Sequence, residues 1–90
     1  MTTDDDPLVF VEKNMFDGVP VLTVYHELDG DWQYLTSLNP SPADAQMVHQ
    51  SHVYATDPSL KTLHSMPKGT WAARAARGEP WTHGLEDPET

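Results

Sequence analysis

The sequence predicts an α+β fold, in which a small antiparallel sheet of three to five strands carries one or two short helices. Two observations in the first half predict the sheet: β-branched and aromatic residues are concentrated in short segments, and Asp-Gly dipeptides separate these segments. One observation in the second half predicts a helix, because an Asp-Pro pair precedes leucines at a helical spacing.

Three strands are expected in the first half, at residues 8–12, 19–28 and 31–38. Asp17-Gly18 and Asp29-Gly30 stand between these segments. Asp-Gly is a favoured dipeptide for the two-residue type I′ turn that joins antiparallel neighbours. The pattern therefore predicts a meander, in which each strand pairs with the next one along the chain.

The second turn also predicts a register. If Asp29 and Gly30 form a two-residue loop, Tyr25 lies opposite Tyr34 and Glu27 lies opposite Trp32. All four side chains then share one face, and the other face carries Leu22, Val24, His26, Leu28 and Leu35. Because both faces have apolar content, one is expected to pack on helices and the other to be partly exposed.

The second half of the chain is less regular. Residues 39–42 break the third strand, and Ser41 with Asp44 has the spacing of a capping box for a short helical turn. Residues 46–56 are ambiguous between strand and helix, with a fourth strand at residues 47–49 as one interpretation.

A helix is expected from Pro58, with Asp57 as its cap and Leu60 and Leu63 on one face. Pro67 and Gly69 end this helix, and residues 70–74 are expected to form a last strand. The ordered part is predicted as a single domain over residues 8–81. Residues 1–7 and 82–90 are expected to fray, because both ends are acidic and contain proline.

Composition excludes several classes of protein. The chain has no cysteine, which rules out disulfides, thiolate nucleophiles and cysteine-based zinc sites and suits a reducing cytoplasm. No apolar stretch reaches the length of a membrane span. Fourteen acidic and five basic residues give a net charge of −9, which opposes binding to nucleic acid or anionic membranes. A charged partner is expected to be a basic protein, or else the acidity serves only solubility.

No motif predicts an enzyme or a cofactor. His49 and His52 have a His-x-x-His spacing, and His26, His64 and His83 could join them, but no carboxylate at ligand spacing accompanies the pair. No metal is therefore expected. The chain also has no Gly-x-Ser-x-Gly motif and no glycine-rich phosphate loop, so catalysis is not expected.

Aromatic and acidic residues around the second turn form the candidate binding site. Aromatic side chains often anchor interfaces, and carboxylates attract a basic partner. The candidates are Tyr25, Glu27, Asp29, Asp31, Trp32 and Tyr34. The alternative is that Trp32 and Tyr34 fill the core beneath a helix. Four further residues are expected to be structural, with Arg74 paired to an acid: Asp57, Pro58, Trp71 and Arg74.

Four short segments carry a family resemblance. They are residues 25–27 (Tyr-His-Glu), residues 30–34 (Gly-Asp-Trp-Gln-Tyr), residues 57–60 (Asp-Pro-Ser-Leu), and Pro67 with Gly69 ahead of Arg74. In this order they resemble the immunity-protein-33-like family, small bacterial proteins classed with the immunity proteins of polymorphic toxin systems. The resemblance runs from about residue 9 to residue 74, and Trp81 matches a late tryptophan of the family. His26 departs from an arginine that members often carry, and residues 37–39 depart from a Ser-Gly.

The resemblance implies a protein that binds a toxin and neutralises it by covering its functional surface, without catalysis. The acidic groups would then steer a basic toxin toward the complex. A second hypothesis is a general interaction or regulatory domain of the cytoplasm with no toxin partner. A third is a small metal-dependent enzyme built on the histidines. The sequence makes no prediction about the oligomeric state.

Overall fold

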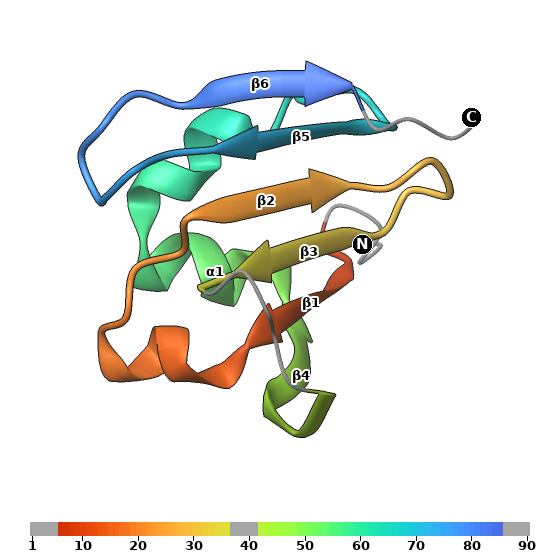
Figure 1. Ribbon diagram of the computed structural model, residues 1–90. Coiled ribbons are helices and arrows are strands. Elements are labelled where there is room, and N and C mark those ends of the chain that lie inside the picture. Colours follow the sequence, from red (N-terminus) through yellow and green to blue (C-terminus); the bar gives the residue numbers. More distant parts are fainter. Residues whose placement is uncertain (1–5, 37–41, 86–90) are drawn as a thin grey trace.

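The computed structural model describes residues 6–36 and 42–85, and their strands form one mixed sheet in the order β4-β1-β3-β2-β5-β6 (Figure 1). The α+β class is confirmed, but the sheet has six strands where three to five were expected. The strands are β1 (Leu8–Glu12), β2 (Thr23–His26), β3 (Trp32–Leu35), β4 (Ala45–His49), β5 (Thr70–Ala73) and β6 (Thr82–Leu85). The helical segments are α1 (Gln50–Thr56) and the 3-10 turns η1 (Lys13–Asp17), η2 (Pro42–Asp44) and η3 (Pro58–Leu63).

The expected meander is wrong at the first connection. Asp17-Gly18 does not form a hairpin turn, because Gly18 caps the end of η1 with a φ of 96°. Residues 13–22 thus make a connection long enough for another strand to lie between β1 and β2. Strand β3 fills this position, pairing parallel with β1 and antiparallel with β2.

The predicted register of β2 and β3 is also wrong, by one residue. The loop has three residues, since Gly30 N donates to Glu27 O at 2.9 Å and Glu27 N donates to Asp31 O at 2.7 Å. Gly30 has a φ of 98°, as expected for a type I turn closed by a left-handed glycine. Tyr25 therefore lies opposite Gln33, and a slip of one residue moves a side chain to the other face of a strand.

The hydrophobic core lies between the sheet and the segments α1 and η3, which lie behind the sheet in the view of Figure 1. Strands supply alternate residues to it, and the helical segments supply Val53, Leu60 and Leu63. His26, Trp32 and Tyr34 form a stack on this face, with 3.8 Å between the first two ring centroids and 6.0 Å between the last two. The sheet contributes Val9, Val11, Val24, Trp32, Tyr34 and Ala72.

Residues 46–56 contain both of the structures that the pattern left open. Strand β4 ends at His49, and α1 begins at the next residue. The predicted start at Pro58 is confirmed, because the Asp57 side chain caps η3 and Leu60 and Leu63 are buried. Ser41, the first residue of the expected capping box, lies outside the described residues.

The predicted ends of the folded part are too narrow on both sides. Strand β6 pairs with β5 beyond Trp81, so residues 82–85 belong to the sheet. Asp6 accepts hydrogen bonds from Ser51 N at 2.8 Å and Ser51 Oγ at 2.9 Å. These contacts tie residue 6 to the first turn of α1.

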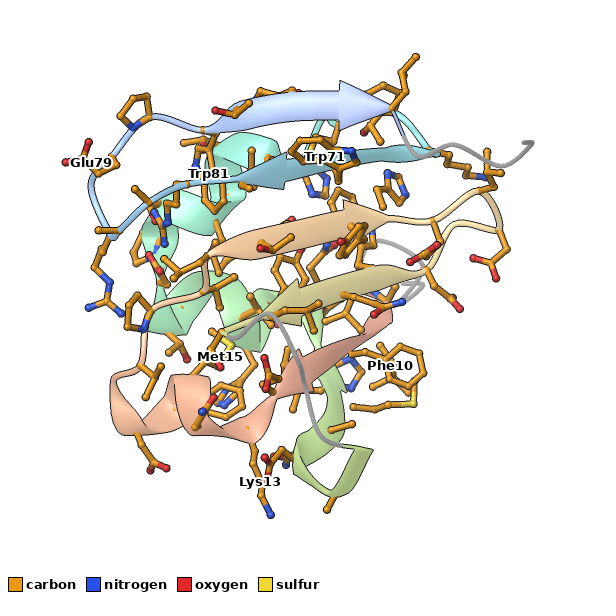
Figure 2. All side chains as sticks on the ribbon, viewed as in Figure 1. Phe10, Lys13, Met15, Trp71, Glu79 and Trp81 are labelled. Atoms are coloured by element: carbon orange, nitrogen blue, oxygen red, sulfur yellow. The ribbon has the colours of Figure 1, made fainter. Side chains whose placement is uncertain are left out.

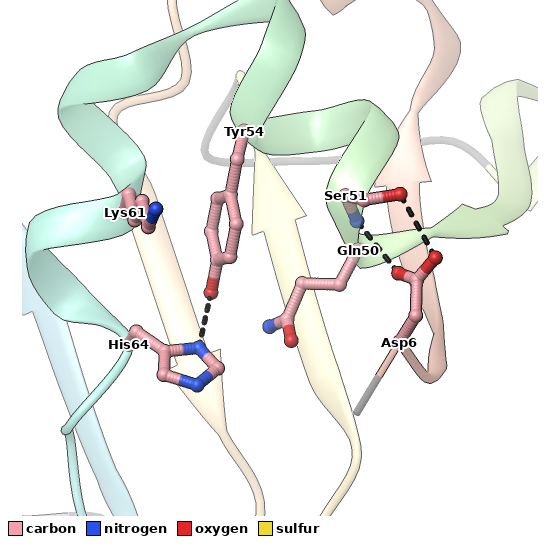
Figure 3. A pocket seen from close by; sticks show the side chains of 6 residues that line it. All are labelled: Asp6, Gln50, Ser51, Tyr54, Lys61 and His64. Atoms are coloured by element: carbon pink, nitrogen blue, oxygen red, sulfur yellow. Dashed lines mark hydrogen bonds between the residues drawn. The ribbon is translucent and has the colours of Figure 1, made fainter. Parts of the chain in front are cut away.

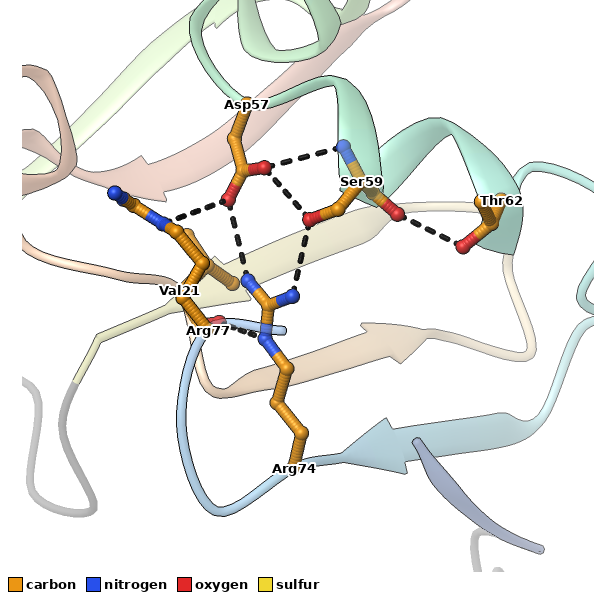
Figure 4. A network of polar contacts seen from close by, with 6 residues as sticks. All are labelled: Val21, Asp57, Ser59, Thr62, Arg74 and Arg77. Atoms are coloured by element: carbon orange, nitrogen blue, oxygen red, sulfur yellow. Dashed lines mark hydrogen bonds and ion pairs between the residues drawn. The ribbon is translucent and has the colours of Figure 1, made fainter. Parts of the chain in front are cut away.

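Arg74 holds the end of β5 against η3 (Figure 4). Its predicted pairing with an acid is confirmed, and the acid is Asp57. Its guanidinium donates to Asp57 Oδ2 at 3.2 Å, and its Nε donates to Val21 O at 3.0 Å. A third bond reaches Ser59 Oγ at 3.0 Å. Because only 1% of the Arg74 side chain is exposed, these bonds replace its lost contact with water.

Candidate protein-binding face

The face of the sheet opposite the core carries a row of side chains that crosses all six strands. Each member is the Cα partner of the next, so neighbours in the row are also neighbours in space. Neighbouring strands lie about 4.8 Å apart, so six strands give a row of roughly 24 Å. From β4 to β6 this open-face row consists of Met47, Phe10, Gln33, Tyr25, Trp71 and Gly84.

Large apolar groups of the open-face row are accessible. Met47 is 49% exposed and Phe10 is 39% exposed, while Tyr25 and Trp71 are half-buried. Leu8, two residues before Phe10 on the same face, is also exposed. Figure 2 shows Phe10 and Trp71 in the view in which α1 and η3 lie behind the sheet. In the described part of the chain, helical segments thus cover one face and leave this one uncovered.

Trp71 lies across β6 because its partner there is a glycine. A Cβ placed on Gly84 would be 2.3 Å from Cζ2 of the Trp71 ring, which is closer than real Cβ contacts allow. The indole therefore occupies the space over the Gly84 backbone. This packing holds the ring in a defined position, and exposed aromatic rings of this kind act as rigid contact surfaces.

Gln33 is the polar member of the open-face row, and it holds a carboxylate beside the aromatic rings. Its Nε2 donates to Glu27 Oε2 at 2.8 Å. Asp29 and Asp31 extend the acidic group around the turn, where Asp31 N donates to Asp29 Oδ1 at 3.0 Å. A Cβ on Gly30 would lie 3.7 Å from Lys68 Nζ, so a lysine partly offsets the charge of this turn.

The structure divides the six predicted binding residues into two groups. Tyr25 and Glu27 reach the open face, and Asp29 and Asp31 are exposed at the turn. Trp32 and Tyr34 are buried in the core, so the alternative of core filling is right for both. The Tyr34 hydroxyl accepts a hydrogen bond from Gln50 Nε2 at 2.8 Å, and burial raises the pKa of Tyr34 far above its ordinary value.

Sequence reasoning missed Phe10 and Met47 and treated Trp71 as structural. Phe10 and Met47 come from β1 and β4, two strands that become neighbours only through a long-range pairing. The local signal was the alternation Leu8, Phe10, Glu12 along one side of β1. Without the strand order, that alternation could not show which residues continue the apolar surface.

A second candidate is a pocket of about 310 Å³ on the helical side of the molecule (Figure 3). Tyr54 Oη and His64 Nδ1 share a hydrogen bond of 2.8 Å across it. Burial raises the pKa of Tyr54, so its hydroxyl stays protonated at neutral pH. The lining residues are Asp6, Gln50, Ser51, Tyr54, Lys61 and His64.

This pocket does not arrange its polar groups for nucleophilic catalysis. Ser51 Oγ donates to Asp6 Oδ2, whereas His64 bonds to Tyr54, so the histidine is not hydrogen-bonded to the serine that it would have to activate. The hydrogen bonds from Ser51 also lower the pKa of Asp6, which makes that carboxylate a weaker base. The open face is the better candidate site.

The histidines of the proposed pair have separate contacts. His49 Nδ1 donates to Asp6 O at 3.1 Å, and the ring of His52 lies 4.9 Å from the ring of Phe16. Within residues 6–36 and 42–85, no three His, Asp or Glu side chains are grouped as metal ligands would be. Among the same residues, no helix is long and apolar enough to cross a membrane.

In comparisons with known proteins, no family model, no curated protein and no solved structure matches this chain. The resemblance to the immunity-protein-33-like family therefore stays a prediction.

Proposed function

We propose that this protein binds another protein without catalysis, using the open-face row as the centre of the contact. The observation that carries this proposal is the open-face row, in which the accessible side chains of Met47 and Phe10 lie on one side of Gln33 and those of Tyr25 and Trp71 on the other. An antiparallel sheet with one solvated face normally presents polar residues there. Large accessible apolar side chains on several strands of one face are instead typical of an interaction site.

The composition of the row fits an interface. Tryptophan, tyrosine, phenylalanine and methionine are the residues enriched in interface centres, and aromatic anchors supply much of the binding free energy. Trp71 and Tyr25 are half-buried in the free protein, so they lose little conformational entropy when a partner covers them. The acidic groups at Glu27 and Asp31 form part of a polar rim.

Charge favours a basic partner. Nine acids and all five basic residues lie within residues 6–36 and 42–85, which gives this part a formal charge of −4. The other five acids lie in residues 1–5 and 86–90, and they complete the total of −9. Like charge opposes binding to nucleic acid, and opposite charge accelerates association with a basic protein.

The family resemblance implies that the partner is a toxin and that this protein neutralises the toxin by covering its functional surface. The alternative is a regulatory partner that is not a toxin. A protection assay separates the two: cells that express the product of an adjacent toxin-like reading frame should survive when this protein is co-expressed. Survival supports the immunity role, and binding without protection supports the general interaction role.

The binding surface itself is tested with single variants against that adjacent product. Phe10→Ala and Tyr25→Ala should each weaken binding by about 2 kcal/mol, a roughly thirtyfold rise in Kd measured by calorimetry. Lys61→Ala is the matched control, because Lys61 is exposed on the helical side. Equal binding by all three variants would reject the open face as the site, and failure of the wild-type protein to bind would reject this toxin as the partner.

A further inference from the structure

Two aromatic residues of the open-face row stand on the neighbouring strands β2 and β5. Tyr25 on β2 and Trp71 on β5 are Cα partners in an antiparallel pair, and both are half-buried. One side of the Trp71 ring packs over Gly84, so the ring is held in place. Trp71 therefore presents a fixed aromatic ring on the strand next to Tyr25.

A carboxylate lies next to this aromatic surface. Glu27 follows Tyr25 by two residues, and its Oε2 accepts from Gln33 Nε2. Gln33 is the Cα partner of Tyr25, so the hydrogen bond brings the carboxylate to the same face. Asp31 lies beside it, since Glu27 N donates to Asp31 O at 2.7 Å. Negative charge thus lies on the same face as the Tyr25 ring.

The same combination of groups already binds an arginine elsewhere in the chain. The guanidinium carbon of Arg74 lies 4.3 Å from the centroid of the Trp81 ring, and the guanidinium donates to Asp57. A planar guanidinium can stack on an aromatic face while its N–H groups donate to a carboxylate, which an ammonium group cannot do as well. This internal example shows which ligand chemistry suits an aromatic ring with a nearby carboxylate.

We infer that Tyr25, Trp71 and Glu27 form a site for an arginine side chain of the partner protein. This inference rests on the proposed function, because it names the group that the open face recognises. The guanidinium stacks on the Tyr25 ring, beside Trp71 on the next strand, and donates to the Glu27 carboxylate. The acidic charge of the chain complements an arginine and disfavours a carboxylate or phosphate at the same place.

The test uses two small peptides in place of the partner. The first is acetyl-Gly-Arg-Gly-amide, and the second has citrulline, which keeps the shape of arginine but carries no charge. The indole N–H resonance of Trp71, assigned by its loss in Trp71→Leu, reports binding in two-dimensional NMR spectra. The arginine peptide should shift this resonance to saturation and bind at least about fivefold more tightly than the citrulline peptide.

Variants identify the groups responsible. Glu27→Gln and Tyr25→Leu should each weaken binding of the arginine peptide at least about threefold, whereas Asp17→Asn, at an exposed acid at the end of η1, should not change binding. Glu27→Gln keeps the side-chain shape, so it stays informative if Tyr25→Leu lowers stability. The absence of a saturating shift, equal binding of the citrulline peptide, or equal effects of Glu27→Gln and Asp17→Asn would overturn the inference.

The outcome is distinguishable from failure of the proposed function. If Phe10→Ala weakens binding to a protein partner but the arginine peptide does not bind, the open face is an interface without an arginine site, and the inference is wrong. If the arginine peptide binds as expected and Phe10→Ala leaves the partner's affinity unchanged, the arginine site stands and the row is not the interface centre.

Discussion

The two faces of the sheet carry similar side chains but differ in what covers them. Trp32 on the covered face is 6% exposed and stacks between His26 and Tyr34, beneath the helical segments. Trp71 on the open face is half-buried and rests on the backbone of β6. Residue type alone does not distinguish them. The role of an aromatic residue in this sheet therefore depends on strand register and on the position of α1 and η3.

The largest expected difference between the faces is in stability. Trp32→Ala should lower the free energy of unfolding by about 3–5 kcal/mol, because it leaves a cavity in the core. Phe10→Ala on the open face should lower it by at most about 1 kcal/mol. Urea unfolding of both variants measures the two costs. Equal costs would mean that the open face is packed as firmly as the core.

Breaking the buried ion pair is the next largest change. Asp57→Asn should cost about 3 kcal/mol in unfolding free energy, because Arg74 then stays buried without its charged partner. Chemical denaturation measures this loss, and the exposed Asp17→Asn is the control. A cost below that of the control would show that Arg74 can be satisfied by Ser59 and Val21 alone.

The same pair also predicts a dependence on pH. Burial by itself raises the pKa of Asp57. Hydrogen bonds from Ser59 and the charge of Arg74 lower this pKa by more than burial raises it, so the net shift is downward. A depressed folded pKa adds stability above the unfolded value of about 4, and this stability is lost as pH falls through the folded value. The wild-type protein should therefore lose more stability on acidification below about pH 4 than Asp57→Asn does.

A smaller effect is expected where the open face meets β6. Gly84→Ala should cost about 1–3 kcal/mol, because the new methyl group collides with the Trp71 ring and displaces it. In a Trp71→Ala background the same change should be nearly neutral, since the collision is gone. A double-mutant cycle of unfolding free energies measures this coupling. Additive effects would show that the indole does not need its place over Gly84.

The smallest effect is expected for the acidic groups of the turn. Asp31→Asn should change the free energy of unfolding by less than about 0.5 kcal/mol, because Asp31 is exposed. Its effect should instead be on association with a basic partner, which should slow and become less salt-dependent. Stopped-flow association rates at two salt concentrations test this. A large loss of stability would place Asp31 among the structural residues.

Local signals in the sequence predicted the local structure well. The first strand, the helical start at Pro58 and its cap Asp57 depend on neighbouring residues, and all three are confirmed. The parallel pairing of β1 with β3 depends on segments far apart in the chain, and no short pattern encodes it. The register error arose because Asp-Gly also fits the last two positions of a three-residue loop closed by a left-handed glycine.

The same contrast between local and long-range features applies to the candidate site. The sequence identified Tyr25 and the acids near it, because they lie together in one hairpin. It placed Trp32 and Tyr34 on the same face as Tyr25, an error that follows directly from the register slip. It could not add Met47 or Phe10, whose neighbourhood requires the order of β4, β1 and β3.

The insertion of β3 between β1 and β2 also has a consequence for the order of folding. The β2–β3 hairpin closes a loop of three residues. The pairing of β1 with β3 instead joins Phe10 to Gln33, which lies 23 positions later in the chain. Closing a long segment costs more entropy before any contact is gained, so the hairpin should form first. Val24 in the hairpin should then have a higher φ-value in folding kinetics than Val9 in β1. Strand β1, which carries Phe10, would dock onto an edge that already exists, so the open face becomes continuous only late in folding.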